Sequence, residues 1–340
     1  MMRCLQLAEL GAGNVAPNPM VGAVLVYEEK IIGEGYHQKY GEAHAEVNCI
    51  NSVDENDKHL IDKSTLYVSL EPCSHFGKTP PCTDLIMKNN IPKVVIGCRD
   101  VYKEVAGKGI AKLQGAGVQV VLSVLEKECI ELNKRFFTFH TQFRPYIILK
   151  WAQSANGKIG SLEKRILISN GFTNRLVHKW RSEETAIMVG TNTALNDNPS
   201  LTTRLWKGKN PVRIVIDKEL RLPESLNIFN AESKTVIYNL YKNEIVNNIT
   251  FIRVDGENMI EEVLRSLFEI NIQSILIEGG AATLQSFIDT GLWDEARIIT
   301  NTSLIIESGI AGPALKNFIP GKSESYPDDR ISFYTRKDIS

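Results

Sequence analysis

The sequence predicts two consecutive α/β domains, and three observations support this prediction. The chain has 340 residues, which at about 150 residues per domain favours two domains over one or three. Short apolar runs of strand length alternate with segments of helical spacing through both halves. All six cysteines lie within the first 129 residues, so the two halves are expected to differ in chemistry.

The composition is that of an ordinary globular protein. Hydrophobic residues make up 43% of the chain and charged residues 23%, and 39 basic against 40 acidic residues give a formal net charge of -1. This balance provides no basic field for binding nucleic acid. The longest apolar stretches, such as 21–27, are far shorter than the about 20 residues of a membrane span. Residues 1–10 predict an amphipathic helix and not a signal core, so we expect a cytoplasmic protein without nucleic-acid or membrane partners.

The first half is expected to begin with a hairpin. The apolar runs 21–26 and 31–36 are separated by the polar tripeptide Glu28-Glu29-Lys30. Further strands are expected over 65–70, 93–97 and 118–121, alternating with helices over 43–53, 82–89 and 109–114. This alternation predicts that the later strands are parallel. A longer amphipathic helix over 125–141 then reaches Arg144-Pro145, where the proline disfavours helix, so we place the boundary between domains 1–143 and 144–340.

The second half is expected to form a mixed sheet with helices. Strands are predicted over 146–152, 186–190, 211–217, 235–239, 250–254, 274–278, 296–300 and 331–334. Helices are predicted over 172–183, 257–268 and 281–290. The run 191–204 is too polar for a core element and long for a plain connection, and such loops often carry function.

A set of metal ligands stands in the first half. His44-Ala45-Glu46 opens a predicted helix, and Cys73 and Cys82 follow a predicted strand. One imidazole and two thiolates supply three ligands of a catalytic zinc, which lowers the pKa of a water in its fourth position toward ~7. Glu46 is suited to take that water's proton and pass it to a leaving amine.

The order His-x-Glu, then Pro-Cys, then Cys is the signature of zinc deaminases acting on cytosine-like and adenine-like rings. The eight residues between the two cysteines are more than the usual gap. One alternative is a free cysteine pair in a core. Another is a structural zinc, which needs a fourth protein ligand, and His75 and Cys49 are the candidates. The three ligands in this order favour the catalytic interpretation.

Three stretches of the first half, 17–24, 41–46 and 71–82, resemble the bifunctional riboflavin-biosynthesis deaminase/reductase family. That family has a long loop between its cysteines, with Gly-Lys-Thr-Pro-Pro as in 77–81. The resemblance implies a cytidine-deaminase-like α/β/α sandwich and a diaminohydroxy-phosphoribosylaminopyrimidine substrate. By position it assigns pyrimidine and ribose phosphate contacts to Asn18, His37, Lys78 and Asp100. The family's usual Asp-Pro-Asn-Pro is replaced here by Asp-Val-Tyr-Lys at 100–103.

In the second half, residues 277–284 combine the end of a strand, two glycines and a helix start. This arrangement lets backbone amides approach phosphate oxygens at a helix N-terminus. The segment is not a G-x-G-x-x-G fingerprint, and a plain tight turn is the alternative.

The resemblance continues through 150–159, 181–183, 193–204 and 211–217, which are similar to the reductase domain of the same family. It implies a dihydrofolate-reductase-like fold that uses NADPH. By position, the cofactor contacts are Ala152, Thr193, Asp197, Gly279, Gly280, Ala281, Ala282, Thr283 and Leu284. The implied substrate contacts are Arg181, Leu201, Arg204 and Glu278, with the arginines suited to a phosphate.

Two further residues of this half are candidates for the reaction itself. Lys150 lies toward the end of its predicted strand and is a candidate positive charge near the reacting sugar. The alternative is a solvated lysine at the end of a strand. Asp197 is implied to lie beside both nicotinamide and sugar, where it could position the cofactor or relay a proton, and a helix or turn cap is the alternative. Asn156 and Leu167 depart from the family, which commonly has Asp and Trp there.

We therefore expect two consecutive reactions on one phosphoribosyl pyrimidine, a zinc-dependent deamination and an NADPH-dependent reduction of ribosyl to ribityl. One rival is a zinc deaminase of nucleic-acid bases whose C-terminal half is a non-catalytic binding domain. Another is a zinc-stabilised binding module without turnover. The sequence leaves the oligomeric state open, with a homo-oligomer as one option.

Overall fold

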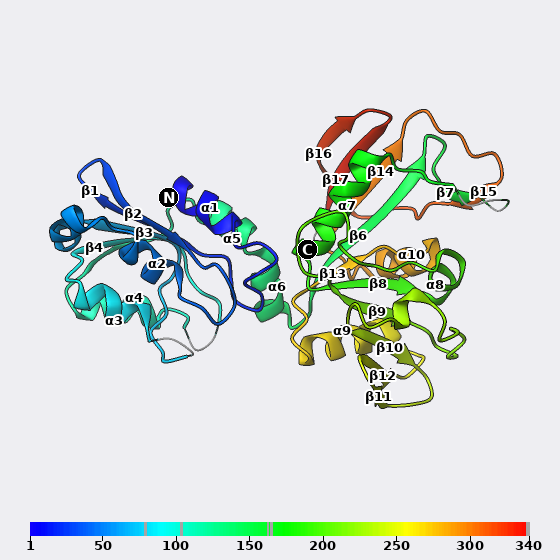
Figure 1. The fold of residues 1–340 in the computed structure, drawn as a ribbon, viewed down its shortest axis with the longest axis horizontal. Helices are drawn as coiled ribbons and strands as arrows, with labels where there is room; N and C mark the ends of the chain where they lie inside the picture. Colours follow the sequence, from blue (N-terminus) through cyan, green and yellow to red (C-terminus); the bar gives the residue numbers. More distant parts are fainter. Residues whose placement is uncertain (78–79, 103–104, 162, 164–165, 338–340) are drawn as a thin grey trace. The chain divides into compact units, whose positions relative to one another are not determined.

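In the computed structural model, which describes residues 1–77, 80–102, 105–161, 163 and 166–337, the chain divides into two units, Met1–Phe143 and Arg144–Ser340 (Figure 1). Each unit has its own central sheet and its own apolar cores. The division falls at Arg144-Pro145, where the last helix of the first unit ends.

The first unit contains a five-stranded sheet of order β2-β1-β3-β4-β5. Its strands are β1 (Gly22–Tyr27), β2 (Lys30–Tyr36), β3 (Thr65–Leu70), β4 (Lys93–Cys98) and β5 (Gln119–Val121). The hairpin of β1 and β2 and the pairing of β1 with β3 are antiparallel, whereas β3, β4 and β5 are parallel. The predicted hairpin and the parallel pairing of the later strands are thus confirmed.

Helices cover both faces of this sheet (Figure 1). They are α1 (Met2–Glu9), α2 (Ala45–Asn51), α3 (Cys82–Lys88), α4 (Lys108–Gly115), α5 (Glu126–Leu132) and α6 (Lys134–Gln142), with a 3-10 helix η1 (Glu55–Lys63). The largest core of the unit joins α2, α3 and α4 to the sheet, and two smaller cores join α1 and α5 to it. The result is the expected α/β/α sandwich.

The predicted single helix over 125–141 is wrong in one respect, because the structure breaks it at Asn133. The Asn133 side chain accepts a hydrogen bond from the Met20 amide at 2.8 Å and donates one to the Met20 carbonyl at 2.9 Å. These bonds pair Asn133 with a segment 113 residues earlier in the chain, and its backbone departs from helical values there. Residues before and after it therefore form separate helices, α5 and α6.

The second unit contains a ten-stranded sheet of order β11-β12-β10-β9-β8-β13-β6-β14-β17-β16. The strands are β6 (Tyr146–Ser154), β8 (Ala186–Gly190), β9 (Val212–Ile216), β10 (Thr235–Asn239), β11 (Glu244–Val246), β12 (Ile249–Arg253), β13 (Ser274–Ile277), β14 (Glu295–Asn301), β16 (Phe318–Tyr326) and β17 (Asp329–Arg336). The strands from β12 to β14 in this order are parallel, and both edges are antiparallel. This is the predicted mixed sheet.

Alternation along the strands explains how both faces of this sheet are covered. In β6, Ile147 and Leu149 belong to a core that includes α9 (Met259–Glu269) and α10 (Ala281–Thr290). Tyr146 and Ile148 belong to a core that includes α7 (Gly171–Glu183). Because successive side chains point to opposite faces of a strand, a strand covered on both faces is apolar throughout, as β8 is.

The structure corrects the prediction for residues 191–204, since Thr191–Asp197 form a helix, α8. Its only buried residue is Ala194, which packs beside β8 and β9. A single apolar contact leaves no helical pattern in the sequence. The short strands β7 (Lys158–Ser161) and β15 (Gly309–Ala311), which pair with each other, and the edge strands β11 and β16 were also not predicted.

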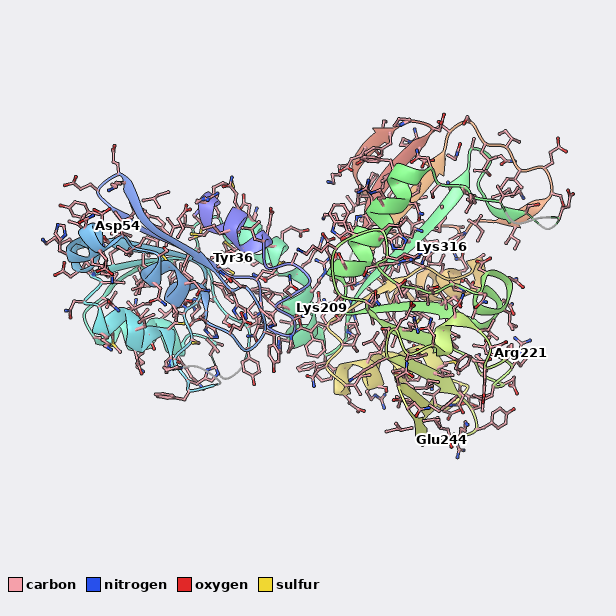
Figure 2. All side chains as sticks on the ribbon, viewed as in Figure 1. Tyr36, Asp54, Lys209, Arg221, Glu244 and Lys316 are labelled. Atoms are coloured by element: carbon pink, nitrogen blue, oxygen red, sulfur yellow. The ribbon has the colours of Figure 1, made fainter. Side chains whose placement is uncertain are left out.

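Charged side chains of both signs lie on the surfaces of the two units (Figure 2). Asp54, Lys209, Arg221, Glu244 and Lys316 are all exposed. Among the described residues, no helix combines the length and the apolar character that a membrane span requires.

Candidate active sites

Three ligand side chains meet in the first unit. His44 is the N-cap of α2, Cys73 lies in the loop after β3, and Cys82 begins α3. The His44 Nδ1 atom is 3.3 Å from Cys82 Sγ and 3.6 Å from Cys73 Sγ, and all three ligand atoms lie within 4.8 Å of one another. One imidazole and two thiols within this distance fit the ligand set of zinc.

The electrostatics of these thiols favour a thiolate. The Cys82 backbone N–H donates to Cys73 Sγ at 3.3 Å. The hydrogen bond from the Cys82 thiol, with a further one from His44, lowers the pKa of Cys73 against the opposing effect of burial. A deprotonated sulfur is the form that binds a metal.

Neither candidate for a fourth protein ligand joins this cluster. Within the described residues, His44, Cys73 and Cys82 are the one group of metal-ligating side chains at such distances. Cys49 is fully buried in the core between α2 and the sheet. The His75 Nδ1 atom is buried without a hydrogen-bond partner in the described chain. Three protein ligands leave a position for water, as in catalytic zinc sites.

Glu46 lies in the first turn of α2, two residues beyond His44, and its side chain is almost completely buried. Burial and the nearby Cys73 raise the pKa of this carboxyl. A buried carboxyl group beside a metal site is suited to proton transfer near neutral pH.

Two predicted substrate residues lie next to the metal ligands. Asn18 Nδ2 is 3.2 Å from His37 Nε2, and His37 Nδ1 is 3.0 Å from the Ala43 carbonyl oxygen. The rings of His37 and His44 have their centroids 5.5 Å apart. Burial lowers the pKa of His37, which favours a neutral ring that can accept or donate a hydrogen bond.

Of the remaining two predicted contacts of this half, the structure describes Asp100 but not Lys78. Asp100 is buried at the end of β4, accepts a hydrogen bond from the Tyr102 backbone at 2.7 Å, and has its pKa raised to about 6 by burial. Lys78 lies outside the described residues.

Glu71 is a residue of this site that the sequence does not single out. It directly precedes Pro72 and Cys73, is 4% exposed, and accepts hydrogen bonds from four backbone amides. The donors are Asp100 (3.3 Å), Gly107 (3.0 Å), Gly109 (3.0 Å) and Ile110 (3.2 Å). Glu71 therefore fixes the loop that carries Cys73 to the loop that carries Asp100 and to the start of α4. The signal available in the sequence is an acid directly after an apolar strand.

The second site forms at the carboxyl ends of parallel strands in the second unit. The register pairs Ile277 of β13 with Leu149 of β6 and with Met188 of β8. Glu278 therefore stands beside Lys150, and its backbone N–H donates to the Met188 carbonyl at 3.0 Å. Ligand sites of α/β proteins commonly lie at this edge of the sheet.

Glu278 joins a buried ion cluster. Arg181 Nε and Nη2 donate to its two carboxylate oxygens at 2.7 and 2.8 Å, and Lys150 Nζ is 3.6 Å from Oε2. Burial opposes ionisation of Glu278, yet Arg181 and Lys150 lower its pKa to about 2. Burial lowers the pKa of Lys150. The cluster thus presents cations beside a carboxylate that is charged at neutral pH.

The glycine pair allows two loops to approach closely. A Cβ atom at Gly279 would lie 2.5 Å from Val189 Cα, and one at Gly280 would lie 3.0 Å from Thr193 Oγ1. Gly280 also has a positive φ of 37°. A Cβ at Gly190 would lie 2.5 Å from Thr283 Oγ1. The loops after β8 and β13 therefore meet at the N-terminus of α10, and a side chain in place of either glycine would fill the space between them. The first amides of α10 have no acceptor within the helix and can bind a phosphate.

The residues that begin α10 differ in what they can offer a ligand. Ala282 is exposed, Ala281 and Thr283 are partly exposed, and the Leu284 side chain is buried in the core below. Leu284 N donates to the Gly280 carbonyl at 3.1 Å, so its amide is already bonded within the helix. Ala152 is partly exposed in β6.

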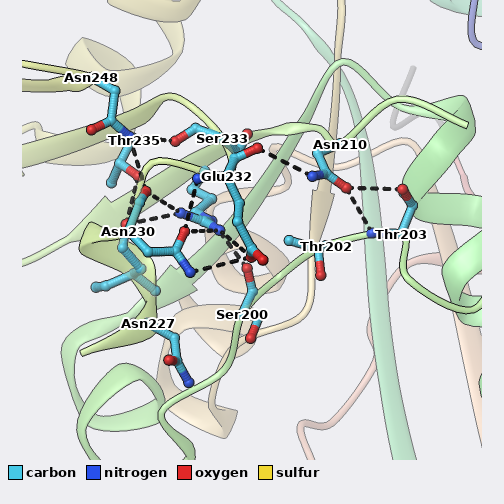
Figure 3. Close-up of polar contacts among 12 residues, drawn as sticks. Ser200, Thr202, Thr203, Asn210, Asn227, Asn230, Glu232, Ser233, Thr235 and Asn248 are labelled. Carbon is cyan, nitrogen blue, oxygen red and sulfur yellow. Dashed lines mark hydrogen bonds and ion pairs between the residues drawn. The ribbon is translucent and has the colours of Figure 1, made fainter. Parts of the chain in front are cut away.

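The loop after α8, which carries the predicted substrate contacts Leu201 and Arg204, is held by polar contacts (Figure 3). Fully buried Arg213 donates to the Ser200 carbonyl at 3.0 Å, and Asn210 accepts hydrogen bonds from the Thr203 amide and hydroxyl, both at 2.9 Å. Leu201 has a positive φ of 52° and a side chain buried in a core cluster. A substrate contact at Leu201 would therefore come from its backbone, whereas Arg204 is exposed.

The structure also shows the positions of three other residues that the sequence analysis named, Asp197, Asn156 and Leu167. Asp197 is the last residue of α8 and is exposed, so of the helix or turn cap that the sequence offered as an alternative, an N-cap of α8 is excluded. Asn156 Nδ2 donates to the Ile306 carbonyl at 2.9 Å, and its Oδ1 accepts from Ser154 Oγ at 2.6 Å, so this side chain fixes two loops. Leu167 is 85% exposed.

Comparison with known proteins matches both halves of the chain. The family model of the cytidine and deoxycytidylate deaminase zinc-binding region matches residues 1–98, and that of the RibD C-terminal domain matches residues 145–305. Riboflavin biosynthesis protein RibD of Aquifex aeolicus is 42% identical over 302 residues, which cover 86% of this chain and 83% of the relative. The protein of the same name from Bacillus amyloliquefaciens is 38% identical, with 93% and 86% covered.

A solved structure is similar over the whole chain. It is the diaminohydroxyphosphoribosylaminopyrimidine deaminase/5-amino-6-(5-phosphoribosylamino)uracil reductase of Thermotoga maritima, with 34% identity and a TM-score of 0.91. The alignment covers 99% of this chain and 97% of that one.

Proposed function

The chain belongs to the family of the bifunctional riboflavin biosynthesis protein RibD, and we propose that its two sites act in turn on one phosphoribosyl pyrimidine. It is a deaminase and a reductase of riboflavin biosynthesis. The proposed first substrate is a diaminohydroxy-phosphoribosylaminopyrimidine, and the aminouracil that deamination releases is the substrate of the reductase.

In the deaminase site, His44, Cys73 and Cys82 would hold zinc, which supplies the Lewis acidity that activates a water toward the amino-bearing ring carbon. Glu46 takes a proton from that water and delivers it to the departing amino group, so that ammonia leaves and a carbonyl remains. The burial of Glu46 beside the ligands supports this assignment. Asn18, His37, Asp100 and Lys78 are the proposed contacts to the pyrimidine and its ribose phosphate.

In the reductase site, NADPH would bind through a residue of β6 and through the segments after β8 and β13, and it supplies a hydride for the first carbon of the sugar. Its proposed contacts are Ala152, Thr193, Asp197 and the Gly279 to Leu284 segment. The close approach of Gly279 to Val189 and of Gly280 to Thr193, and the first amides of α10, which have no acceptor within the helix, support a phosphate group there.

The substrate of the reductase would be bound by Arg181, Arg204, Glu278 and the backbone of Leu201. Opening of the glycosylamine to an imine moves a proton to the oxygen of the sugar ring. Lys150 is the proposed proton donor, because burial lowers its pKa and the carboxylate of Glu278 orients it. Asp197 is the proposed group that positions the nicotinamide beside the sugar.

A deaminase of nucleic-acid bases with a non-catalytic C-terminal half is disfavoured. Residues 145–305 match the RibD C-terminal domain, and the relatives match over both halves. Cytoplasmic localisation and a homo-oligomeric state remain predictions from the sequence.

The observation that carries the proposal is the buried Glu46 beside the three-ligand cluster, in one chain with the Arg181–Glu278–Lys150 cluster. The test incubates purified protein with the pyrimidine phosphate and follows ammonia release and NADPH oxidation separately. Glu46→Gln should reduce ammonia release by roughly 10²–10⁴-fold and leave reduction of supplied aminouracil nearly unchanged. Glu55→Gln, which changes an exposed carboxylate of the same unit, is the control. Equal loss of both activities in folded protein would contradict the assignment.

A further inference from the structure

A buried histidine of the second unit has no partner. His178 lies in α7 and is 1% exposed, and neither its Nδ1 nor its Nε2 atom has a hydrogen-bond partner in the part of the chain that the structure describes. A neutral imidazole carries one donor and one acceptor. Burying both without partners is unfavourable, so the unbonded ring points to a ligand that completes it.

The surroundings of His178 identify the site to which it belongs. Arg181 is three residues further along α7, so the two side chains lie on the same side of the helix. The charged groups that act on the ring are Arg181, Glu278 at the end of β13, and Arg204 in the loop after α8. Lys150 Nζ of β6 lies 3.6 Å from Glu278 Oε2 and so belongs to the same charged cluster. His178 therefore lies within the proposed reductase site.

Neither ring nitrogen meets a hydrogen-bond partner at normal geometry within the described residues. The Thr202 backbone lies close enough to raise the pKa of the imidazole, and the Thr202 carbonyl accepts a hydrogen bond from Arg181 Nη1 at 3.2 Å. Arg181 is in turn fixed in its position by its two bonds to Glu278.

The charges around the ring indicate which kind of ligand fits. Lys150, Arg181 and Arg204 are cationic and Glu278 is anionic, so the group carries a net charge of +2. A phosphate monoester carries between about −1.5 and −2 at neutral pH and offers three acceptor oxygens. Its charge matches that of the cluster.

We propose that His178 is a further substrate-binding residue of the reductase site, donating an imidazole N–H to a phosphate oxygen of the substrate that Arg181 and Arg204 bind. This inference rests on the proposed function of the second unit. It explains why a polar ring is buried here, since the ligand supplies the acceptor that the protein lacks.

The protonation of the ring supports this role. Burial, followed by the charges of Arg181 and Arg204, lowers the pKa of His178 to about 4. The free site therefore holds a neutral ring, which adds no further positive charge beside the two arginines. A bound phosphate dianion cancels this positive charge and lies beside the ring, so we expect the pKa of His178 to rise in the complex and the ring to take up a proton as phosphate binds.

The main experiment uses the full-length protein and supplies the aminouracil substrate, so that reduction is measured without prior deamination. His178→Leu removes the donor and keeps an apolar side chain of similar size. We expect the KM for the phosphorylated substrate to rise about 10-fold to 100-fold, with kcat changed less than about threefold. The KM for the same substrate without its phosphate should not change. His178→Gln, which retains an N–H donor, should recover part of the loss.

Two controls separate binding from folding. His59→Leu changes an exposed histidine of the first unit and should leave both activities unchanged. Ammonia release and the melting temperature of His178→Leu report whether the chain is folded. An unchanged KM in a folded His178→Leu variant overturns the inference.

A measurement on the wild-type protein does not depend on any variant being folded. The chain has six histidines. In spectra of ¹⁵N-labelled imidazoles, one ring should titrate at about pH 4. Addition of inorganic phosphate should shift this ring saturably toward its protonated form. The absence of such a ring overturns the inference. If the wild type releases ammonia but never oxidises NADPH, the proposed reductase function fails, while the phosphate titration still decides whether His178 binds phosphate.

Discussion

The carboxylate of Glu71 provides the sharpest test of how the metal site is built. Glu71→Gln preserves the shape of the side chain but replaces one oxygen with an NH₂ group. Each oxygen of Glu71 accepts two backbone N–H groups, one from Gly109 and Ile110 and the other from Asp100 and Gly107. In the variant, whichever way the amide turns, two buried N–H donors face another donor.

The expected cost follows from these four bonds. A buried donor without an acceptor costs about 1–3 kcal/mol, so two of them cost roughly 2–6 kcal/mol. A unit of this size has a total stability of only about 5–15 kcal/mol. A Cβ atom at Gly109 would lie 2.1 Å from the Pro72 carbonyl oxygen, so the two loops are in direct contact and any displacement is passed to the neighbouring Cys73.

The assay follows melting by calorimetry, bound zinc, ammonia release and NADPH-dependent reduction in the full-length protein. We expect the transition of the first unit to fall by at least ~4 °C, with loss of zinc and of ammonia release, while reduction of supplied aminouracil is retained. Glu55→Gln, in the same unit, serves as the matched control because its carboxylate is exposed. A Glu71→Gln variant with normal melting and normal ammonia release would refute the reasoning.

Three further predictions follow from the two sites. Cys82→Ser should lose most of the bound zinc and of the ammonia release, because it removes one of three ligands, and metal analysis showing full zinc would contradict the assignment. Asp197→Asn should retain its melting temperature, because an exposed acid at the C-terminal end of α8 does not interact favourably with the helix dipole. The variant should lose NADPH-dependent reduction while deamination continues. Unchanged reductase turnover would assign Asp197 no role. Because the folded-state pKa of Glu278 is about 2, below its ordinary value of 4.5, its ion pairs stabilise the second unit above about pH 4.5 and this stability is lost as the pH falls through about 2. Melting of Glu278→Gln between pH 5 and 2 should therefore depend less on pH than that of the wild type, and parallel curves would refute this.

The elements that sequence reasoning predicted best are those whose own pattern determines their structure. Strands β3, β8 and β10 are apolar runs that begin and end where the prediction placed them. The pattern of consecutive residues in each of these strands indicates whether one or both of its faces are buried. The hairpin of β1 and β2 is equally local, since its strands are separated by a short polar turn.

The elements that were missed depend on partners far away in the sequence. Asn133 ends α5 because it bonds to Met20, 113 residues earlier. The edge strand β16 is almost entirely exposed and exists because β17 pairs with it. Neither feature leaves a periodic signal in its own segment.

The same distinction applies to the sites. The order of residue types, His-x-Glu, then Pro-Cys, then Cys, was enough to predict that His44, Cys73 and Cys82 form one cluster, because each motif stands at a helix start or a strand end that its own segment predicts. The roles of Glu71 and His178 were not predicted, since each depends on what surrounds the side chain. Glu71 accepts hydrogen bonds from four backbone N–H groups, and His178 has no hydrogen-bond partner at normal geometry among the described residues. Neither property distinguishes these residues from surface residues in the sequence.

Both units place a buried glutamate directly after a strand that has a parallel neighbour, and this position explains the chemistry available to each. Glu71 follows β3, which pairs in parallel with β4, and Glu278 follows β13, which pairs in parallel with β6 and β8. At the carboxyl ends of parallel strands, the next residues of neighbouring strands lie side by side. Glu71 therefore meets backbone amides of the segment after β4 and of the first turn of α4, which satisfy its oxygens without a cation, and it positions the loop of Cys73. Glu278 meets Lys150 and Arg181 instead, so a charged cluster remains beside the loop after β8. From the same place on a sheet, one carboxylate fixes the loop of a proposed metal ligand and the other orients the cations proposed to bind the substrate.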